Sequence, residues 1–67
     1  MNITVNGTTQ PMPPDASLIA LLAQVVGDCT DGVAVARNFE VVRRAEWPSI
    51  RLADGDVVEI VHAKQGG

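Results

Sequence analysis

A single helical stretch among strand-like runs is the feature that most constrains how this chain can fold. Between residues 15 and 27 the apolar residues recur at the i, i+3, i+4 and i+7 spacing of one helix face: Leu18, Leu21, Leu22 and Val25. Asp15 or Ser17 can accept hydrogen bonds from the first free backbone amides, and Gly27 suits a left-handed cap at the other end. A helix of about ten residues is only marginally stable alone, so this one must pack on a sheet.

A β-hairpin is predicted before the helix. Residues 2–6 alternate apolar and polar side chains, and Asn6-Gly7 is typical of a tight two-residue turn. The return strand is expected over residues 8–12. Because Pro11 cannot donate a hydrogen bond to a ladder, this second strand belongs at an edge of the sheet and ends quickly.

Three further strands are predicted after the helix. Residues 33–37 and 40–43 flank Asn38-Phe39 and form a second hairpin, although Phe39 is an awkward residue for such a turn. The stretch 45–50 is expected to be irregular, because Pro48 favours an extended conformation at the residue before it. After the turn at residues 53–56, the final strand is expected over residues 57–63.

The element order β-β-α-β-β-β predicts an α+β fold, in which one helix covers one face of a mixed sheet of about five strands. The inward-facing set is expected to be Ile3, Val5, Leu18, Leu21, Leu22, Val25, Val33, Val35, Val58 and Ile60, with Trp47 at one edge. On the final strand, Val57, Glu59 and Val61 face the other way. If nothing covers the two valines, they form part of an apolar binding patch.

Composition narrows the class of protein. The chain has 67 residues, 46% of them hydrophobic and 19% charged, which is typical of one small folded domain. A formal charge of -3 and only two aromatic residues, Phe39 and Trp47, provide neither the basic stripe nor the stacking platform of a nucleic-acid-binding protein. No apolar run reaches the roughly 18 residues of a membrane helix, and no signal peptide is recognisable. We therefore expect a cytoplasmic protein that binds neither nucleic acid nor membrane.

Side chains that could catalyse a reaction by themselves are scarce. One His and one Cys, without paired carboxylates at helix spacing, predict no catalytic residue, no metal site and no bound cofactor. Cys29 could carry a persulfide, but no basic residue adjoins it to favour the thiolate, and we interpret it as a plain loop thiol. His62 is interpreted as a solvated residue at a strand end, and Trp47 as a packing residue rather than an interface anchor.

The Gly66-Gly67 end of the chain is where we expect chemistry. An α-carboxyl group is ionised at pH 7 and unreactive, but activation by ATP to an acyl-adenylate would make it open to attack. Glycine lacks a Cβ and can thread a narrow channel, and five extended residues from Ala63 onward reach at most about 17 Å. Two glycines that end a short tail directly after the final strand of such a domain therefore favour activation of the Gly67 carboxyl group.

The stretches "MNITVNG", "SLIALLAQ" and "VVRRAEWPSIRLADGDVVEIV" ahead of "GG" resemble the ubiquitin-like sulfur carrier proteins, most closely the ThiS family of thiamine thiazole synthesis, over the whole chain. The resemblance implies a ubiquitin-like β-grasp fold with its first and last strands adjacent and parallel at the sheet's centre. It also implies a domain of residues 1–63 and a flexible C-terminal tail of residues 64–67.

The resemblance further implies a carrier that is a co-substrate of partner enzymes and not itself an enzyme. An E1-like adenylating enzyme of the ThiF type would use ATP and Mg²⁺ to adenylate Gly67, and a cysteine-derived persulfide sulfur would then displace AMP to leave a thiocarboxylate. Thiazole synthase of the ThiG type would take up the sulfur. Gly66 would thread the partner's channel, and the partner-contact residues would be Val61, His62, Ala63, Lys64 and Gln65.

Three alternatives stay open from the sequence. The chain could be a sulfur carrier of another pathway, such as the small subunit of molybdopterin synthase, although "EWPS" and "DGDVVEIV" favour the thiamine carrier. It could be a protein modifier conjugated to lysines, as ubiquitin is, which would leave covalent adducts in cells. It could also be a β-grasp interaction module whose glycines are incidental. Extension of the chain by one alanine would abolish a carrier's function and leave such binding intact.

Overall fold

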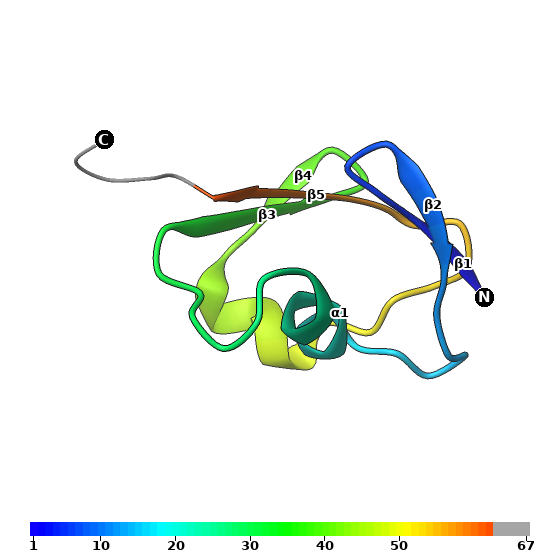
Figure 1. Cartoon of the computed structure of the whole chain (residues 1–67), viewed down its shortest axis with the longest axis horizontal. Helices are drawn as coiled ribbons and strands as arrows, with labels where there is room; N and C mark the ends of the chain where they lie inside the picture. Colours follow the sequence, from blue (N-terminus) through cyan, green and yellow to red (C-terminus); the bar gives the residue numbers. More distant parts are fainter. Residues whose placement is uncertain (63–67) are drawn as a thin grey trace.

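A five-stranded mixed sheet with one α-helix on one face forms the protein, seen in a computed structural model in which residues 1–62 are described (Figure 1). Residues 63–67 lie outside the described residues. The elements in chain order are β1 (Asn2–Val5), β2 (Thr8–Pro11), α1 (Leu18–Val25), β3 (Val33–Arg37), β4 (Glu40–Val42), the 3₁₀ helix η1 (Arg44–Ser49) and β5 (Val57–His62).

The sheet has the strand order β2-β1-β5-β3-β4. Strands β1 and β5 pair in parallel, with Thr4 opposite Val57 and Val5 opposite Val58. The other neighbouring pairs are antiparallel. The predicted adjacency of the first and last strands is confirmed, and so is the expectation that the proline-bounded β2 is an edge strand.

Both hairpins turn through two residues in the left-handed region. Asn6 and Gly7 have φ values of 49° and 85°, and Asn38 and Phe39 have φ values of 51° and 71°. Asparagine and glycine adopt this region readily, whereas a bulky side chain such as that of Phe39 is strained there by about 1 kcal/mol or more. Both predicted turns are confirmed, and Phe39 is also 81% exposed.

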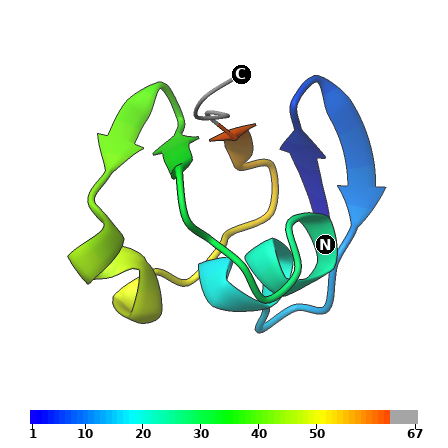
Figure 2. The ribbon, with the colours of Figure 1, turned by 60° about the vertical axis from the view of Figure 1, so that its left-hand side comes forward.

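The helix α1 begins and ends at the residues that its sequence indicates. Of the two proposed caps, the structure uses Ser17, whose Oγ accepts a hydrogen bond from the Ala20 amide at 3.1 Å. Gly27, with φ of 85°, donates its amide to the Leu22 carbonyl and closes the other end as predicted. Figure 2 shows the curved sheet above and α1 below it.

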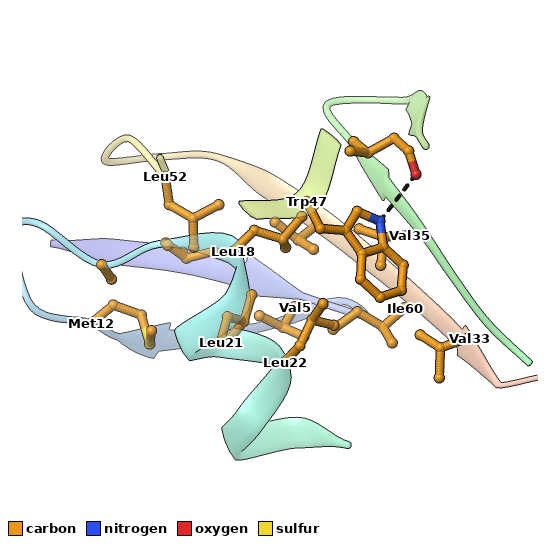
Figure 3. Close-up of a cluster of buried hydrophobic side chains, with 14 residues drawn as sticks. Val5, Met12, Leu18, Leu21, Leu22, Val33, Val35, Trp47, Leu52 and Ile60 are labelled. Carbon is orange, nitrogen blue, oxygen red and sulfur yellow. Dashed lines mark hydrogen bonds between the residues drawn. The ribbon is translucent and has the colours of Figure 1, made fainter. Parts of the chain in front are cut away.

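Most of the stretch expected to be irregular, residues 45–49, is instead part of the 3₁₀ helix η1, so that prediction was wrong there. Trp47 is only 4% exposed, and its indole Nε1 donates to the Val42 carbonyl at 3.2 Å (Figure 3). The Arg44 guanidinium lies 4.6 Å from the centroid of the indole ring. Burial of this large side chain outweighs the extended preference that Pro48 imposes on the residue before it.

The core lies between the sheet and the two helices, and it differs from the predicted set at one end of α1. Val25 was expected inside but is 43% exposed, because the last turn of α1 extends past the packed residues and Val26 packs against the core instead. The remaining predicted residues are buried. The sequence pattern missed four buried residues from short or irregular segments: Met12, Ala16, Val42 and Leu52.

Candidate functional site

The face of the sheet opposite α1 holds exposed apolar side chains on β5. Val58 and Ile60 point into the core, so Val57, Glu59 and Val61 lie on the other face, as the alternation predicted. Val57 is half-buried and Val61 is 60% exposed. Within residues 1–62 both helices lie on the core side, and neither covers this outer face (Figure 1).

Two alanines create a shallow hollow in the outer face. Ala34 of β3 lies opposite Val61 of β5, and Ala36 lies between Val41 of β4 and Glu59 of β5. The short methyl groups leave a depression of about 170 Å³ between the taller side chains on either side. Small-molecule pockets span roughly 300–1,000 Å³, so this volume suits a single side chain of a partner protein. We call this feature the outer-face hollow; it consists of Ala34, Ala36, Val41, Glu59 and Val61.

The other half of the outer face is polar. Thr4 of β1 lies opposite Thr9 of β2, and their hydroxyl oxygens are 3.4 Å apart. The apolar side chains of the outer face thus lie on β3, β4 and β5. This apolar surface adjoins His62, the exposed last residue of β5, after which the chain continues towards Gly66 and Gly67.

A buried carboxylate fixes the beginning of β5. Asp56 is 7% exposed and accepts hydrogen bonds from the Ala53 amide at 2.8 Å, the Arg37 Nε at 2.9 Å and the Asn38 Nδ2 at 3.1 Å. Burial alone raises the pKa of Asp56, but these three donors and the charge of Arg37 outweigh it and hold the pKa below its usual value. Asn38 also accepts from the Val57 amide at 2.9 Å, which ties the β3–β4 turn to the first residue of β5.

A second asparagine contacts the other half of β5. The Asn6 Nδ2 donates to the Ile60 carbonyl at 3.1 Å, and the Asn6 Oδ1 accepts from the Ile60 amide at 2.8 Å. On its opposite side β5 stays paired with β3 up to His62, which lies opposite Val33. The strand that leads to the two glycines is therefore hydrogen-bonded on both sides.

Comparison with known proteins identifies the family. The model of the ThiS family matches residues 3–67. The sulfur carrier protein ThiS of Thermus thermophilus is 37% identical over 65 residues, which cover 97% of this chain and 98% of the relative. The chain belongs to the ThiS family. It is a sulfur carrier of thiamine biosynthesis, as the resemblance implied.

Solved ThiS structures have the same fold as this chain. The crystal structure of the thiamine biosynthesis protein ThiS from Geobacter metallireducens superposes with a TM-score of 0.83 at 30% identity, and each chain is covered completely. A solution structure of a thiamine biosynthesis protein from the same organism gives 0.80 at 32% identity, covering all of this chain and 88% of the other. The predicted ubiquitin-like β-grasp fold is confirmed.

A longer protein also contains a region similar to this ThiS-family chain. A thiazole synthase of Paramagnetospirillum magneticum is 33% identical over all 67 residues, which correspond to 20% of the length of that synthase. The region similar to the carrier is thus a minor part of that polypeptide.

The structure places two of the predicted partner-contact residues of this ThiS-family chain. Val61 lines the outer-face hollow, and His62 is exposed at the end of β5. The other predicted site residues lie outside the described residues: Ala63, Lys64, Gln65, Gly66 and Gly67. Cys29 is an exposed free thiol, and Trp47 is buried as a packing residue.

The described part of the chain holds neither a cluster of metal-ligating side chains nor a membrane-spanning helix. Residues 1–62 contain no group of three or more His, Cys, Asp or Glu side chains that could hold a metal ion. The one α-helix described, at eight residues, is too short to cross a membrane.

Three features were not predicted from the sequence: the role of Asp56, the asparagine contacts to β5 and the depth of the hollow. "ADGD" was interpreted only as a turn, although Asp56 immediately precedes a strand whose first amides need partners. The alternation "VAVA" at residues 33–36 was a usable signal for the hollow. It places two small apolar residues on a strand face where solvent would favour larger polar ones.

Proposed function

We propose that this chain carries sulfur for the thiazole ring of thiamine as a thiocarboxylate on the carboxyl group of Gly67. The observation that carries the proposal is the match to the ThiS family, which runs through residue 67 and therefore includes both glycines. The chain acts as a co-substrate of its partner enzymes, and it holds no cofactor of its own. Persulfide chemistry and ATP are both available in a reducing cytoplasm, where we place the carrier.

The chemistry begins with activation of the carboxylate. A Gly67 carboxylate oxygen attacks the α-phosphorus of ATP in an E1-like enzyme of the ThiF type, and pyrophosphate leaves. The partner's Mg²⁺ offsets the negative charge of the phosphates. The terminal sulfur of a cysteine-derived persulfide then attacks the Gly67 carbonyl carbon, so a C–S bond forms as the C–O bond to AMP breaks. A thiol finally cleaves the remaining S–S bond by disulfide exchange and leaves the thiocarboxylate.

The thiocarboxylate suits the last step of the sequence. Sulfur is a softer and better nucleophile than the carboxylate oxygen that it replaces, and a synthase of the ThiG type incorporates it into the thiazole ring. The Paramagnetospirillum thiazole synthase supports this partner, because a region similar to the carrier is joined covalently to that enzyme.

The segment between β5 and the carboxyl group delivers Gly67 to these enzymes. Gly66 has no Cβ, so the partner's backbone can close tightly around it. Ala63, Lys64 and Gln65 form the remaining contacts inside the partner's channel. His62 contacts the rim of that channel, because it is exposed at the end of β5.

The outer-face hollow is the surface on which the partner rests while the glycines enter its site. The hollow adjoins the end of β5, so a protein bound there is already next to the departing chain. Its apolar walls accept one aliphatic or aromatic side chain, and the exposed Glu59 carboxylate favours a lysine or arginine beside it.

The intact mass of the carrier tests the proposal. The protein is incubated with a thiamine-pathway adenylating enzyme, ATP, Mg²⁺ and a persulfide source, and is then exposed to thiazole synthase. We expect the mass to rise by the difference between sulfur and oxygen and to return on addition of the synthase. An unchanged mass, under conditions that convert a known ThiS protein, would refute the proposal.

Variants next to the reacting group sharpen this experiment. Gly66→Val should block adenylation because its side chain cannot enter the channel, whereas Gln65→Val places the same side chain one residue earlier, where a larger one already stands, and should react. Extension of the chain by one alanine should abolish thiocarboxylate formation entirely. Normal yield from Gly66→Val would show that no narrow channel surrounds this residue.

A further inference from the structure

The parallel ladder between β1 and β5 ends before β5 does. The Thr4 amide donates to the Asp56 carbonyl at 3.0 Å, and the Asn6 amide donates to the Val58 carbonyl at 3.0 Å. Asn6 then turns left-handed and the chain enters the hairpin to β2. The backbone of β1 therefore no longer lies beside β5 at Ile60. The amide and the carbonyl of Ile60, which face the β1 side, need another partner.

The side chain of Asn6 takes the place of the missing backbone. A carboxamide has the same donor and acceptor as a peptide group, and here both are used on one residue. Its Nδ2 donates to the Ile60 carbonyl at 3.1 Å, while its Oδ1 accepts from the Ile60 amide at 2.8 Å. The ladder therefore extends to a residue only seven positions before Gly67.

We propose that Asn6 is a positioning residue for sulfur transfer, because its side chain holds the carboxyl-terminal half of β5 in the sheet. The proposal rests on the proposed function, in which the chain after His62 must enter a partner's site. The segment 63–67 spans at most about 17 Å, so the place from which it departs determines where Gly67 can reach. If the end of β5 separates from the sheet, the departure point moves back along the strand and fewer molecules present Gly67 correctly.

This role predicts a specific kinetic effect. Asn6 is remote from the reacting carboxyl group, so the chemistry of a correctly bound carrier is unaffected. The fraction of molecules able to bind correctly falls instead, which raises the apparent KM in inverse proportion to that fraction. A variant without the carboxamide should therefore show a higher KM for the carrier with an unchanged kcat.

The chain offers a matched pair of variants that separates this effect from turn geometry and stability. Asn6→Gly removes the carboxamide but keeps a residue that adopts the left-handed turn easily. Asn38→Gly does the same in the other hairpin, where φ is 51° and the side chain contacts Val57 at the opposite end of β5. Asn6→Asp keeps the acceptor for the Ile60 amide and loses the donor to its carbonyl.

The test measures adenylation of the purified carriers by pyrophosphate release, with the carrier as the varied substrate. We expect Asn6→Gly to raise KM about fivefold, as if one molecule in five remained competent, with kcat unchanged. Asn38→Gly should leave KM within about twofold of the wild type. The KM of Asn6→Asp should lie between the values of the two glycine variants. Amide hydrogen exchange should become faster at Ile60 in Asn6→Gly and at Val57 in Asn38→Gly.

Each outcome decides the question. Equal KM values for Asn6→Gly and the wild type would overturn the positioning role, and so would equal increases in the two glycine variants. A fall in kcat without a change in KM would also contradict it. If the wild-type carrier is not adenylated at all, the proposed function fails, and the positioning role fails with it.

Discussion

The two ends of β5 are built in different ways. At the beginning, the buried Asp56 carboxylate accepts three hydrogen bonds, and Asn38 ties the first amide of the strand to a turn. At the end, His62 and Val61 are exposed, and one asparagine side chain holds Ile60 on the β1 side. The beginning of β5, remote from the glycines, is thus held by more side-chain hydrogen bonds than its end, where Val61 and His62 stay exposed.

Removal of the Asp56 carboxylate should have the largest effect on the stability of the fold. Asp56→Ala leaves buried donors without an acceptor and Arg37 without its charge partner, so we expect a loss of about 2–3 kcal/mol in the free energy of unfolding. Urea denaturation measures this. Asp54→Ala is the control, because the exposed Asp54 accepts one hydrogen bond from the Asn2 amide. Equal losses in the two variants would show that the network does not hold the beginning of β5.

A charge in the outer-face hollow should affect the partner and spare the fold. Val61→Asp places a carboxylate among apolar walls beside Glu59, so binding to thiazole synthase should weaken about tenfold or more. Because Val61 is 60% exposed, stability should change by no more than about 0.5 kcal/mol. Calorimetric titration with the synthase provides the measurement. Thr9→Asp adds the same charge on the polar half of the same face, and equally weak binding by both variants would refute the hollow as the docking surface.

Acidification should loosen the beginning of β5 through Asp56. Its pKa in the folded protein lies below the unfolded value of about 3.9, so ionised Asp56 stabilises the fold above that pH. This contribution is lost as the pH falls through the lower, folded pKa. Chemical denaturation between about pH 6 and about pH 2, a range that brackets the ordinary pKa of about 3.9, should show the loss. The curve for Asp56→Asn should be flatter, and parallel curves would contradict this assignment.

Relief of the strained β3–β4 turn should have the smallest effect. Phe39 has φ of 71° and is 81% exposed, so Phe39→Gly removes strain at little cost in buried area. Glycine also gains freedom in the unfolded state, and we expect a net stabilisation of about 0.5 kcal/mol. Thermal denaturation measures it. Adenylation should be unchanged because this turn lies next to Val57, at the end of β5 that is remote from the glycines. A rise in the KM for the carrier would show that Phe39 contacts the partner.

Local sequence patterns were enough to predict the elements, and they failed where distant contacts decide the structure. The alternation of Ile3 and Val5 and the spacing of Leu18, Leu21 and Leu22 report burial directly. Val25 continues the same helical spacing, but whether the core extends that far depends on the sheet. The 3₁₀ conformation around Trp47 follows from burial of the indole, which the neighbouring proline does not reveal.

The candidate site was predictable only where a local sequence pattern determines it. The alternation of side chains along β5 predicts that Val61 lies on the outer face, as it does. The depth of the hollow depends on Ala34 and Ala36 lying beside Val61 and Val41, and this requires the strand order and the register. The asparagine at position 6 was predicted as a turn residue, but its partner, Ile60, lies 54 residues away in the chain.

The parallel pairing of β1 with β5 also determines when this protein can fold during its synthesis. Thr4 and Val57 are direct partners although they lie 53 positions apart in the chain, so the centre of the sheet cannot form until β5 has been made. A polypeptide that stops short of β5 exposes two unpaired strand edges, on β1 and on β3, and cannot close its core. We therefore expect proteases to degrade a fragment that lacks β5 faster than the folded protein.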